Sequence, residues 1–346
     1  MYNSQLNGIL IAGLVLTFSI VLLFPIAAHA QFPRFKPTTI EYDTTFLDRS
    51  PSKWSIRLYS VTKYQQFKLN SRSTDATLRY APNKFYGTGA GFSFNRLNLD
   101  VGFNAFKSNP HNDSENESRA FDFIGSLYSG QHLFEIYLQQ SIGMFGWLNT
   151  EGDVIFPGTD TTIAYREDIS AFNFGVDYNL LFNSKKITFG SLIGTEIQKK
   201  SAGGVMAGLF FSAYDLHADS SIVPSAYAGI FEDHSEVTDA FVFNIGMSGG
   251  YAYTIVFPLH LYLTLSLAPG FSFSRSELKA HDEWYVAGHP VNLSFKLISR
   301  GAIGYGGKKV YGVLSLVNDK SFINISNKNY FIQDMGKVKL VFGYRI

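Results

Sequence analysis

Apolar and polar residues alternate with a period of two along much of the chain, and this pattern predicts β-strands with two unlike faces. The clearest example runs from His260 to Ser274, well beyond the usual strand length of about 5–6 residues. Its odd positions are mostly Leu and Phe, and its even positions are mostly Ser, Thr, Gly or Ala. The same alternation recurs in residues 97–106, 171–182, 241–255 and 337–346. The sequence therefore predicts an all-β protein with long strands.

Two architectures produce such strands. A soluble sandwich buries its apolar face and wets its polar face, whereas a membrane barrel turns its apolar face to lipid and small or polar residues to the interior. The runs are long enough for tilted membrane-spanning strands of about 9–11 residues. Gly, Ser and Asn dominate the polar faces, and aromatic residues such as Tyr251 and Phe273 stand near strand ends, as interfacial girdles do. We therefore predict a transmembrane antiparallel β-barrel.

The alternating segments give thirteen candidate strands, whereas a bacterial single-chain barrel has an even number. We expect about 12 strands, with 14 next, so one candidate is wrong. Residues 70–84, 215–238 and 318–335 are the hardest to assign. Short links at 130–131 and 183–185 are expected as periplasmic turns, and the stretches 108–117 and 142–167 as outer loops. The candidate strands are 54–69, 84–95, 97–107, 118–129, 131–141, 169–182, 186–199, 203–215, 239–255, 259–274, 289–303, 308–317 and 336–346.

The first thirty residues predict export. Residues 9–23 are almost continuously apolar, and Ala28-His29-Ala30 supplies the small residues that a signal peptidase reads. We expect residues 1–30 as a signal peptide, 31–52 as a periplasmic lead-in and 53–346 as the outer-membrane barrel. A retained membrane anchor is the alternative, because the apolar run is nearly long enough to span a bilayer and no basic residue precedes it. After residue 30 no apolar run is long enough for a membrane-spanning helix.

Composition agrees with a lipid-facing surface. Charged residues make up 16% and apolar residues 46%, with 32 Phe and 20 Tyr; soluble domains carry about 25% charged residues. This composition does not suit a disordered chain, which has low hydrophobicity and high charge. The formal net charge of +1 gives no basic excess for nucleic acid. The chain has no Cys, which excludes disulfides, thiolate metal sites and cysteine nucleophiles.

Several motifs carry a resemblance to a known family. They are Lys53-Trp54-Ser55-Ile56-Arg57-Leu58-Tyr59, Leu78-Arg79-Tyr80-Ala81-Pro82-Asn83, Lys199-Lys200-Ser201-Ala202-Gly203 and Gly250-Tyr251-Ala252-Tyr253-Thr254. With these motifs the chain, from about Thr44 to its end, resembles an uncharacterised outer-membrane family of Bacteroidetes-type bacteria, domain-of-unknown-function family 4421. The resemblance implies fold and location only, since the family has no established activity to transfer. The last residues also resemble the C-terminal strand signal read by the barrel assembly machinery, although the chain ends in Ile346 where that signal usually ends in Phe.

We find no motif for catalysis or a cofactor. Phosphate loops, dinucleotide fingerprints, metalloprotease helices and lipase elbows are absent from the sequence, so we expect no catalytic residue, cofactor or metal site. Glu232 and His234 are close enough in sequence to bind one metal ion together, but loop residues that are simply solvated are far more common. His111, His217 and His281 are also expected in loops. His260, on the polar face beside Tyr262, is expected as an interfacial histidine.

The most informative residues are charges that the alternation turns inward. They are Arg57, Asp100, Asp122, Glu135, Asp177, Glu196, Lys296, Arg300, Lys337, Lys339 and Arg345. Acids occupy the middle strands and bases the first and last strands, which closure brings side by side. One interpretation is an ion-pair network that plugs a small barrel, because unpaired charges in a confined interior are costly. The other is a charged constriction that selects solutes.

These observations leave three classes of function open. We favour a non-enzymatic structural or surface-interaction barrel with a plugged lumen. A narrow solute pore and a membrane-embedded lipid hydrolase are the alternatives. The expected partners are outer-membrane lipid and the barrel assembly machinery, with no nucleic acid; a ligand cannot be named from the sequence.

Overall fold

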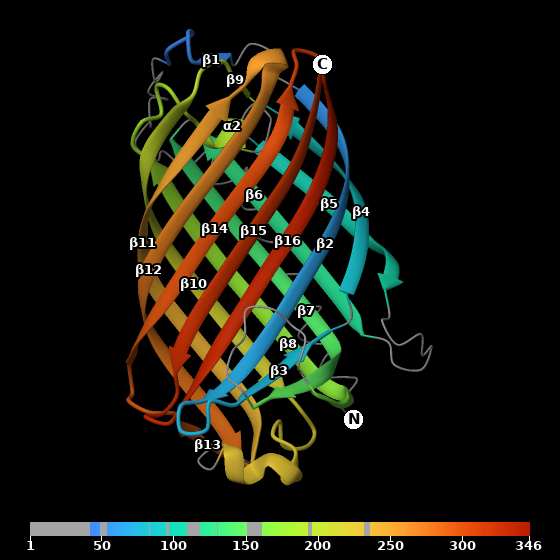
Figure 1. Cartoon of the computed structure of the whole chain (residues 1–346), viewed down its shortest axis with the longest axis vertical. Coiled ribbons are helices and arrows are strands. Elements are labelled where there is room, and N and C mark those ends of the chain that lie inside the picture. The colour runs from blue at the N-terminus through green and yellow to red at the C-terminus, as the bar shows by residue number, and fades with distance from the viewer. Residues whose placement is uncertain are drawn as a thin grey trace, which may run out of the picture. The chain divides into compact units, whose positions relative to one another are not determined.

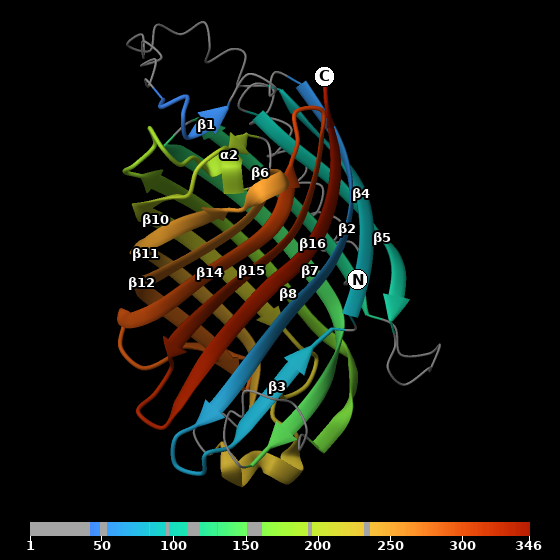
Figure 2. The ribbon, with the colours of Figure 1, turned by 45° about the horizontal axis from the view of Figure 1, so that its top comes forward.

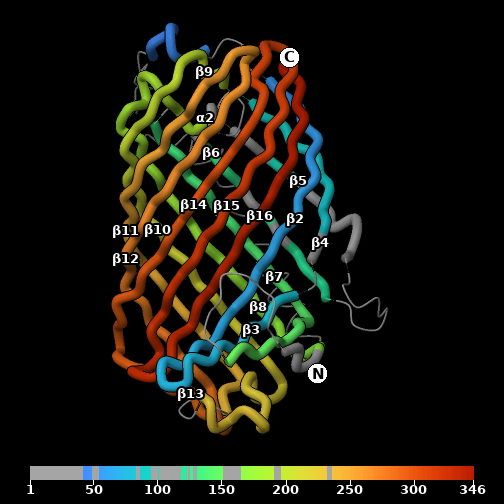
Figure 3. The backbone as a smooth tube through the Cα atoms, in the orientation of Figure 1, coloured from blue at the N-terminus to red at the C-terminus, as the bar shows by residue number. Residues whose placement is uncertain are grey.

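The long strands pair in an antiparallel sheet that closes into a ring (Figures 1 and 3). The computed structural model describes residues 42–48, 54–82, 84–94, 97–108, 118–129, 131–150, 161–192, 196–231 and 236–346. The expected signal peptide, and with it cleavage after Ala30, lies outside the described residues and stays a prediction. No helix in the described ranges is long and apolar enough to cross a membrane.

The strand bounds are β1 Leu47–Asp48, β2 Trp54–Ser71, β3 Thr77–Ala81, β4 Lys84–Phe94, β5 Leu97–Ser108, β6 Arg119–Ser129, β7 His132–Asn149, β8 Thr161–Leu181, β9 Ile197–Gln198, β10 Ala202–His217, β11 Val237–Val256, β12 Leu261–Ala280, β13 Glu283–Val286, β14 Asn292–Gly306, β15 Val310–Asn324 and β16 Asn329–Arg345. A short helix, α2 (Phe189–Leu192), and two 3-10 turns, η1 (Ser225–Ile230) and η3 (Pro258–His260), lie between strands.

The barrel closes through two junctions. β11 pairs with β12 along almost its whole length, and β2, the first long strand, pairs with β16, the last. The end of the barrel at which β16 finishes is here called the turn end, because short connections such as 257–260 and 307–309 lie there. The opposite end, with residues 218–231 and 281–291, is called the loop end. The predicted all-β closed barrel is therefore confirmed.

The number of strands around the wall differs between the ends. β2 and β7 are bridged by β3 near the loop end, which closes a ring of ten strands. Nearer the turn end β4, β5 and β6 take the place of β3, and that path contains twelve strands. Pro82 separates β3 from β4; it has no backbone N–H for the ladder, so the chain leaves its pairing with β7 there.

The pairing between two of the inserted strands, β5 and β6, is short, and we call this part of the wall the β5–β6 seam. In the described chain the ladder between β5 and β6 consists of three residue pairs, from Leu97–Leu127 to Leu99–Gly125. Farther toward the loop end the ribbon of β5 bends away from the barrel (Figures 1 and 2). Asp100 directly follows the last of these pairs.

Two assignments from the sequence are wrong. The expected strand at 186–199 is not formed: its described residues, 186–192 and 196–199, form turns, α2 and β9. Ile187 and Phe189 are buried there, so these apolar side chains pack inside the protein and do not face lipid. The expected outer loop at 142–167 is too long, because β7 continues to Asn149 and β8 already begins at Thr161.

The apolar face of the strands is the exposed one. On β12, Leu265, Phe271 and Phe273 are 56%, 59% and 63% exposed, whereas their neighbours Thr264, Ser272 and Ser274 are buried. The same arrangement holds on β8, β11 and β16. A soluble sandwich would bury the apolar face, and exposed apolar area this large marks a surface that another phase covers. The alternation thus follows the rule of membrane barrels.

The apolar outer band has the height of a bilayer. On β12 the outward positions from Leu261 to Phe273 are apolar, and the next two, Arg275 and Glu277, are charged. With a rise of about 3.3 Å per residue and a tilt of about 45°, this stretch spans about 28 Å, close to the hydrocarbon thickness of about 30 Å. The strands therefore extend beyond the band toward the loop end.

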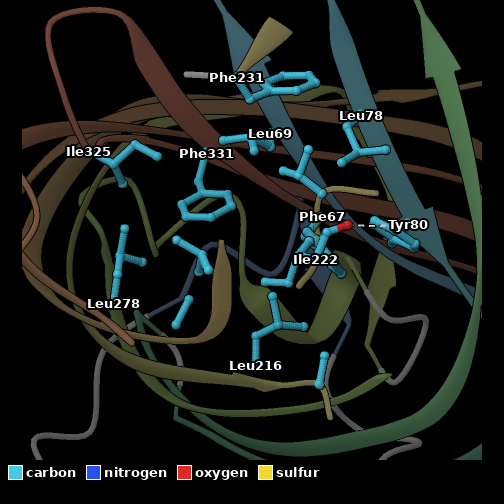
Figure 4. Close-up of a cluster of buried hydrophobic side chains, with 14 of the residues drawn as sticks. Phe67, Leu69, Leu78, Tyr80, Leu216, Ile222, Phe231, Leu278, Ile325 and Phe331 are labelled. Carbon is cyan, nitrogen blue, oxygen red and sulfur yellow. Dashed lines mark hydrogen bonds between the residues drawn. The ribbon is translucent and has the colours of Figure 1, made fainter. Parts of the chain in front are cut away.

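An apolar cluster fills the loop end of the barrel, shown in Figure 4. Phe67, Leu78 and Phe331 come from the wall, whereas Ile222 and Phe231 come from the connection between β10 and β11. Tyr80 donates a hydrogen bond to the carbonyl of Ile222 over 2.7 Å. The connection thus folds inward and forms a plug, which we call the loop-end plug (residues 218–231).

A second apolar cluster fills the turn end. Ile187 and Phe189, from the connection that carries α2, pack with Leu181 and Met206 of the wall, and Phe46 packs against them. β1 pairs with β9 at this end, and Figure 2 shows β1 and α2 there. Part of the expected lead-in, residues 42–48, therefore belongs to the folded barrel.

The lipid face gives a first prediction. Leu265→Arg places a charge near the middle of the apolar band and should lower the free energy of unfolding by about 2–4 kcal/mol, whereas Leu261→Arg, on the same face at the edge of the band, should cost about 0–1 kcal/mol. Denaturant titration of both variants folded in lipid vesicles measures the difference. Equal unfolding free energies would contradict the membrane assignment.

Candidate functional site in the barrel interior

The charges predicted from the alternation lie mostly on the inner side of the wall. Inward positions are occupied by Arg57 on β2, Asp100 on β5, Glu135 on β7, Asp177 on β8, Lys296 and Arg300 on β14, and Lys337, Lys339 and Arg345 on β16. Long strands of fixed register hold these side chains at defined heights, so that residues far apart in sequence face one another across the lumen.

One cluster joins the first and last strands. Asp100 accepts hydrogen bonds from Arg57 Nε at 2.7 Å and from Lys339 Nζ, and Arg57 Nη2 lies 2.6 Å from the same carboxylate. Arg57 also donates to Ser93 Oγ, and the Lys339 ammonium lies 3.8 Å from the centre of the Tyr59 ring. Gly91 is required here, because a Cβ at that position would lie 2.0 Å from Asp100 Oδ1.

A second cluster surrounds Lys296, which is fully buried. Its Nζ lies 2.9 Å from Asp319 Oδ2 and 4.0 Å from Asp177 Oδ1, and 4.5 Å from the centre of the Phe210 ring. Glu135, on the strand beside Asp177, accepts a hydrogen bond of 2.7 Å from Arg300. The predicted acids of the middle strands and bases of β14 thus meet across the lumen.

Two of the predicted charges, Glu196 and Arg345, lie away from these clusters, and Lys337 lines the cavity described below. Glu196 lies in the connection between β8 and β10 and accepts a hydrogen bond from Thr188; its assignment to the lumen is wrong because residues 186–199 are not a barrel strand. Arg345 lies at the turn end, where it donates to the Gly307 carbonyl and stacks on Tyr311. Asp122 pairs with Gln139 in the β6–β7 ladder, and its side chain lies outside the described residues.

Sequence reasoning missed Asp319, Lys63 and Tyr137. Asp319 continues the inward positions of β15 after Tyr311 and Val313, but the alternation is blurred from residue 318 onward because outward positions there are polar as well. Lys63 lies directly opposite Lys337 in the β2–β16 ladder. Counting every second residue along the whole of each strand, and not only along its apolar part, would have placed all three side chains inside the barrel.

A small cavity lies between these charges. Its volume is about 90 Å³, and it is lined by Lys63, Glu135, Tyr137, Gln139, Asp177, Ile298, Arg300, Val317, Asp319, Met335, Gly336 and Lys337. A water molecule takes about 30 Å³ in the liquid, so the cavity holds a few waters or one small ion. This cavity lies between the apolar clusters at the two ends.

The loop-end plug is fastened by a pair of charges outside the apolar band. Arg166 forms two hydrogen bonds with Asp168, at 2.7 and 2.6 Å, and also donates to the carbonyls of Ser220 and Ser221. Asp168 accepts a hydrogen bond from the backbone N–H of Asp219. Bidentate pairs of this kind are strong and fix geometry, so they hold the start of the plug against β8.

No group of three His, Asp or Glu side chains suited to a metal ion occurs within the described ranges. Glu232, His234 and His111 lie outside the described residues. His217 is bonded to Asp239 at 2.5 Å, and His281 is 2.5 Å from Glu236. His260 lies in η3 and not on β12, where its ring contacts Tyr305.

Residues 41–346 match the family described as Domain of unknown function (DUF4421). The chain belongs to this family. This match confirms the family that the sequence motifs predicted. No curated protein matches the chain.

Among solved structures the chain is similar to several barrels at low identity. The β domain of the Bordetella autotransporter BrkA has 7% identity and a TM-score of 0.38, covering 84% of this chain and 100% of that one. OmpT of Vibrio cholerae has 8% identity and a TM-score of 0.26, covering 85% and 98%. The Pseudomonas putida toluene transporter TodX has 7% identity and a TM-score of 0.30, covering 86% and 91%. Likeness at this level carries no argument about what this chain binds or transports.

The Lys296 cluster gives a second prediction. Asp319→Asn should lower the free energy of unfolding by about 3–5 kcal/mol, because it leaves a buried cation poorly compensated. Asp177→Asn should cost less, since its carboxylate is farther from Lys296. Denaturant titration measures both, with the exposed turn variant Asp75→Asn as control. If Asp319→Asn costs no more than about 0–1 kcal/mol, as exposed pairs do, the lumen is water-filled.

The fastening of the plug gives a third prediction. Arg166→Ala removes the contacts to Asp168, Ser220 and Ser221, so proteolysis within residues 218–231 should become several-fold faster while the barrel stays folded. Arg275→Ala, which removes an exposed pair with Glu277 on the outer surface, is the matched control. Unchanged cleavage in Arg166→Ala would show that apolar packing alone holds the plug.

Proposed function

We propose that this protein is a closed, non-conducting β-barrel of the bacterial outer membrane, with a structural or surface-interaction role and no enzymatic one. In this proposal the twelve long strands of the wall all cross the bilayer, and the chain arrives as an exported precursor that loses residues 1–30. Its last strand is the part that the barrel assembly machinery would read.

The observation that carries the proposal is the filling of the lumen. An apolar cluster occupies each end, ion pairs lie in the middle, and a cavity of about 90 Å³ lies among them. Barrels of about eight strands are filled by side chains, whereas those of 16–18 strands leave an aqueous channel. A barrel of ten to twelve strands falls nearer the filled class, and its interior residues are used in packing and pairing.

The outer band supports the membrane assignment, and the loop end offers a surface for contact. β13 exposes Trp284, Tyr285 and Val286, and it pairs with the part of β12 that follows the charged residues Arg275 and Glu277. Exposed aromatic residues beyond the lipid band are typical of contact surfaces. With the lumen occupied, such a surface is where this barrel would meet a partner.

Conductance in planar bilayers tests the proposal, and it is our fourth prediction. The wild-type protein should insert without steady conductance, because neither the plugs nor the ion pairs leave a continuous water path. Insertion is verified by protection of the band from protease. Glu135→Gln in the lumen and Glu277→Gln on the outer surface should behave alike. A steady wild-type conductance whose ion selectivity changes in Glu135→Gln but not in Glu277→Gln would overturn closure and favour a narrow pore.

A further inference from the structure

A group of exposed lysines lies at the turn end of the barrel. They come in two pairs from the connection between β8 and β10, Lys185-Lys186 near its start and Lys199-Lys200 near its end. Two of their ammonium groups reach the ring of Phe46, just before β1. We call the four lysines and this ring the Phe46 lysine cluster.

Hydrogen bonds fix the backbone of the cluster. The side-chain amide of Gln198 donates to the carbonyls of both Lys186 and Lys200, at 2.7 and 2.9 Å. The N–H of Lys199 donates to the carbonyl of Phe46 over 2.7 Å. Gln198 itself is buried, and its strand β9 pairs with β1. The fold therefore holds the two lysine pairs side by side.

Two ammonium groups converge on one ring. Lys186 Nζ lies 4.9 Å and Lys200 Nζ 5.5 Å from the centre of the Phe46 ring. Phe46 is half-buried, because it packs against the apolar cluster of the turn end. Since a phenyl ring has no net charge, this contact holds both cations in place without neutralising them. The cluster therefore presents concentrated positive charge at the surface.

Nearby carboxylates compensate the cluster in part. Lys199 Nζ lies 3.8 Å from Asp48. Asp43 lies near enough to Lys186 and Lys200 to be attracted by their charges. Among the described residues, however, neither Lys186 nor Lys200 forms a salt bridge. Each therefore has an ammonium to offer to a further anion.

The cluster lies at the edge of the lipid-facing band. Phe182 and Val205, which stand before and after it in the chain, are exposed and joined by a backbone hydrogen bond. Tyr251 and Tyr253 of the adjacent strand β11 are exposed beside Gly203. Aromatic residues at the end of an apolar band mark the interface with the headgroups. The lysines follow directly beyond this interface.

The lysines can reach the headgroups from this position. Lys185 is three residues from Phe182, and Lys200 is three residues from Gly203; such a stretch of chain spans at most about 11 Å. The headgroup layer adds about 5–7 Å on each side of the hydrocarbon core. A lysine side chain also carries its ammonium away from its own backbone toward polar surroundings. Lipid phosphates at this height are therefore within reach.

We propose that the Phe46 lysine cluster binds the phosphate of an anionic phospholipid in the leaflet at the turn end, with Lys186 and Lys200 as ligands. The site rests on the outer-membrane placement in the proposed function and adds a lipid partner to it. Several basic residues directly beside a membrane span attract anionic headgroups. The exposed Phe182 and Val205 lie beside the cluster and offer a surface to the acyl chains, so the site suits a lipid better than a free phosphate.

The chain offers a matched control at the same end. Lys308 and Lys309, between β14 and β15, are exposed and stand next to the exposed Tyr305 and Val310. They carry the same charge as Lys186 and Lys200 but belong to a different connection. General attraction between the rim and an anionic surface would involve both pairs, whereas the proposed site involves one.

The test measures binding of a short-chain phosphatidylglycerol to the detergent-solubilised full-length protein by calorimetry at low ionic strength. Phosphatidylcholine with the same chains is the neutral probe, and the wild type should bind it more weakly. Lys186→Gln/Lys200→Gln should weaken phosphatidylglycerol binding at least about tenfold, since each lysine near a lipid surface contributes a factor of about five. Lys308→Gln/Lys309→Gln should leave the binding nearly unchanged, and Lys186→Arg/Lys200→Arg, which keeps both charges, should retain it.

Other outcomes overturn the lipid site and identify what replaces it. Equal affinity of the wild type for the two lipids shows that the headgroup charge is not recognised. Equal losses in the two Gln double variants show diffuse attraction by the rim. Glycerol phosphate that binds as tightly as phosphatidylglycerol shows that the ligand is a free phosphate. Polyglutamate that binds more tightly than the lipid, and is lost in Lys186→Gln/Lys200→Gln, shows an acidic protein partner.

These results are separable from those that test the proposed function. Both Gln double variants exchange exposed side chains, so they should unfold at the denaturant concentration of the wild type. Failure of lipid binding, together with the expected Leu265→Arg penalty and a barrel that does not conduct, overturns the lysine site alone. Loss of the Leu265→Arg penalty overturns the membrane placement, and the lipid site with it.

Discussion

The structure depends on the closure of a hydrogen-bonded ladder in a solvent that offers the backbone no partners. In a bilayer every N–H and C=O must be satisfied within the protein, which for strands requires a closed barrel. The β11–β12 and β2–β16 ladders meet this requirement. Closure also fixes the two faces of every strand, because alternate side chains must point to lipid and to the lumen. The exposed leucines of β12 and the buried charges of β16 are consequences of this one constraint.

The enclosed interior imposes a second requirement. A ring of ten to twelve strands lies between the filled barrels of about 8 strands and the open channels of 16–18. In this ring many of the described inward side chains pack in apolar clusters or form ion pairs. Residues from distant segments do both: Ile222 and Phe231 fill one end, and Arg300 of β14 meets Glu135 of β7 in the middle. Such buried pairs give position and specificity more than net stability. The charges of the lumen thus hold opposite walls at a defined separation.

Much of the fold could be predicted from local sequence, because the alternation of apolar and polar residues indicates which face of the strand each residue occupies. The outward Leu265 and the inward Asp177 follow from it directly. Residues 186–199 were assigned wrongly because Ile187 is apolar for a different reason: it packs into the turn end, and a local pattern does not distinguish a lipid contact from a plug. The partners of the charges depend on the stagger of distant strands. Arg300 of β14 thus meets Glu135 of β7. Asp319, on β15 beside the strand of Lys296, was missed because the outward residues around it are polar too and hide the alternation.

The change from ten strands to twelve along the barrel axis has a consequence for the form of the wall. Neighbouring strands are about 4.8 Å apart, and β4, β5 and β6 take the place of β3, so the perimeter of the wall is larger by roughly 10 Å toward the turn end. The narrower level is at the loop end, where β3 pairs with residues 67–70 of β2, beyond the apolar band. The barrel therefore tapers toward the loop end, and residues 218–231 have the smaller of its two mouths to fill.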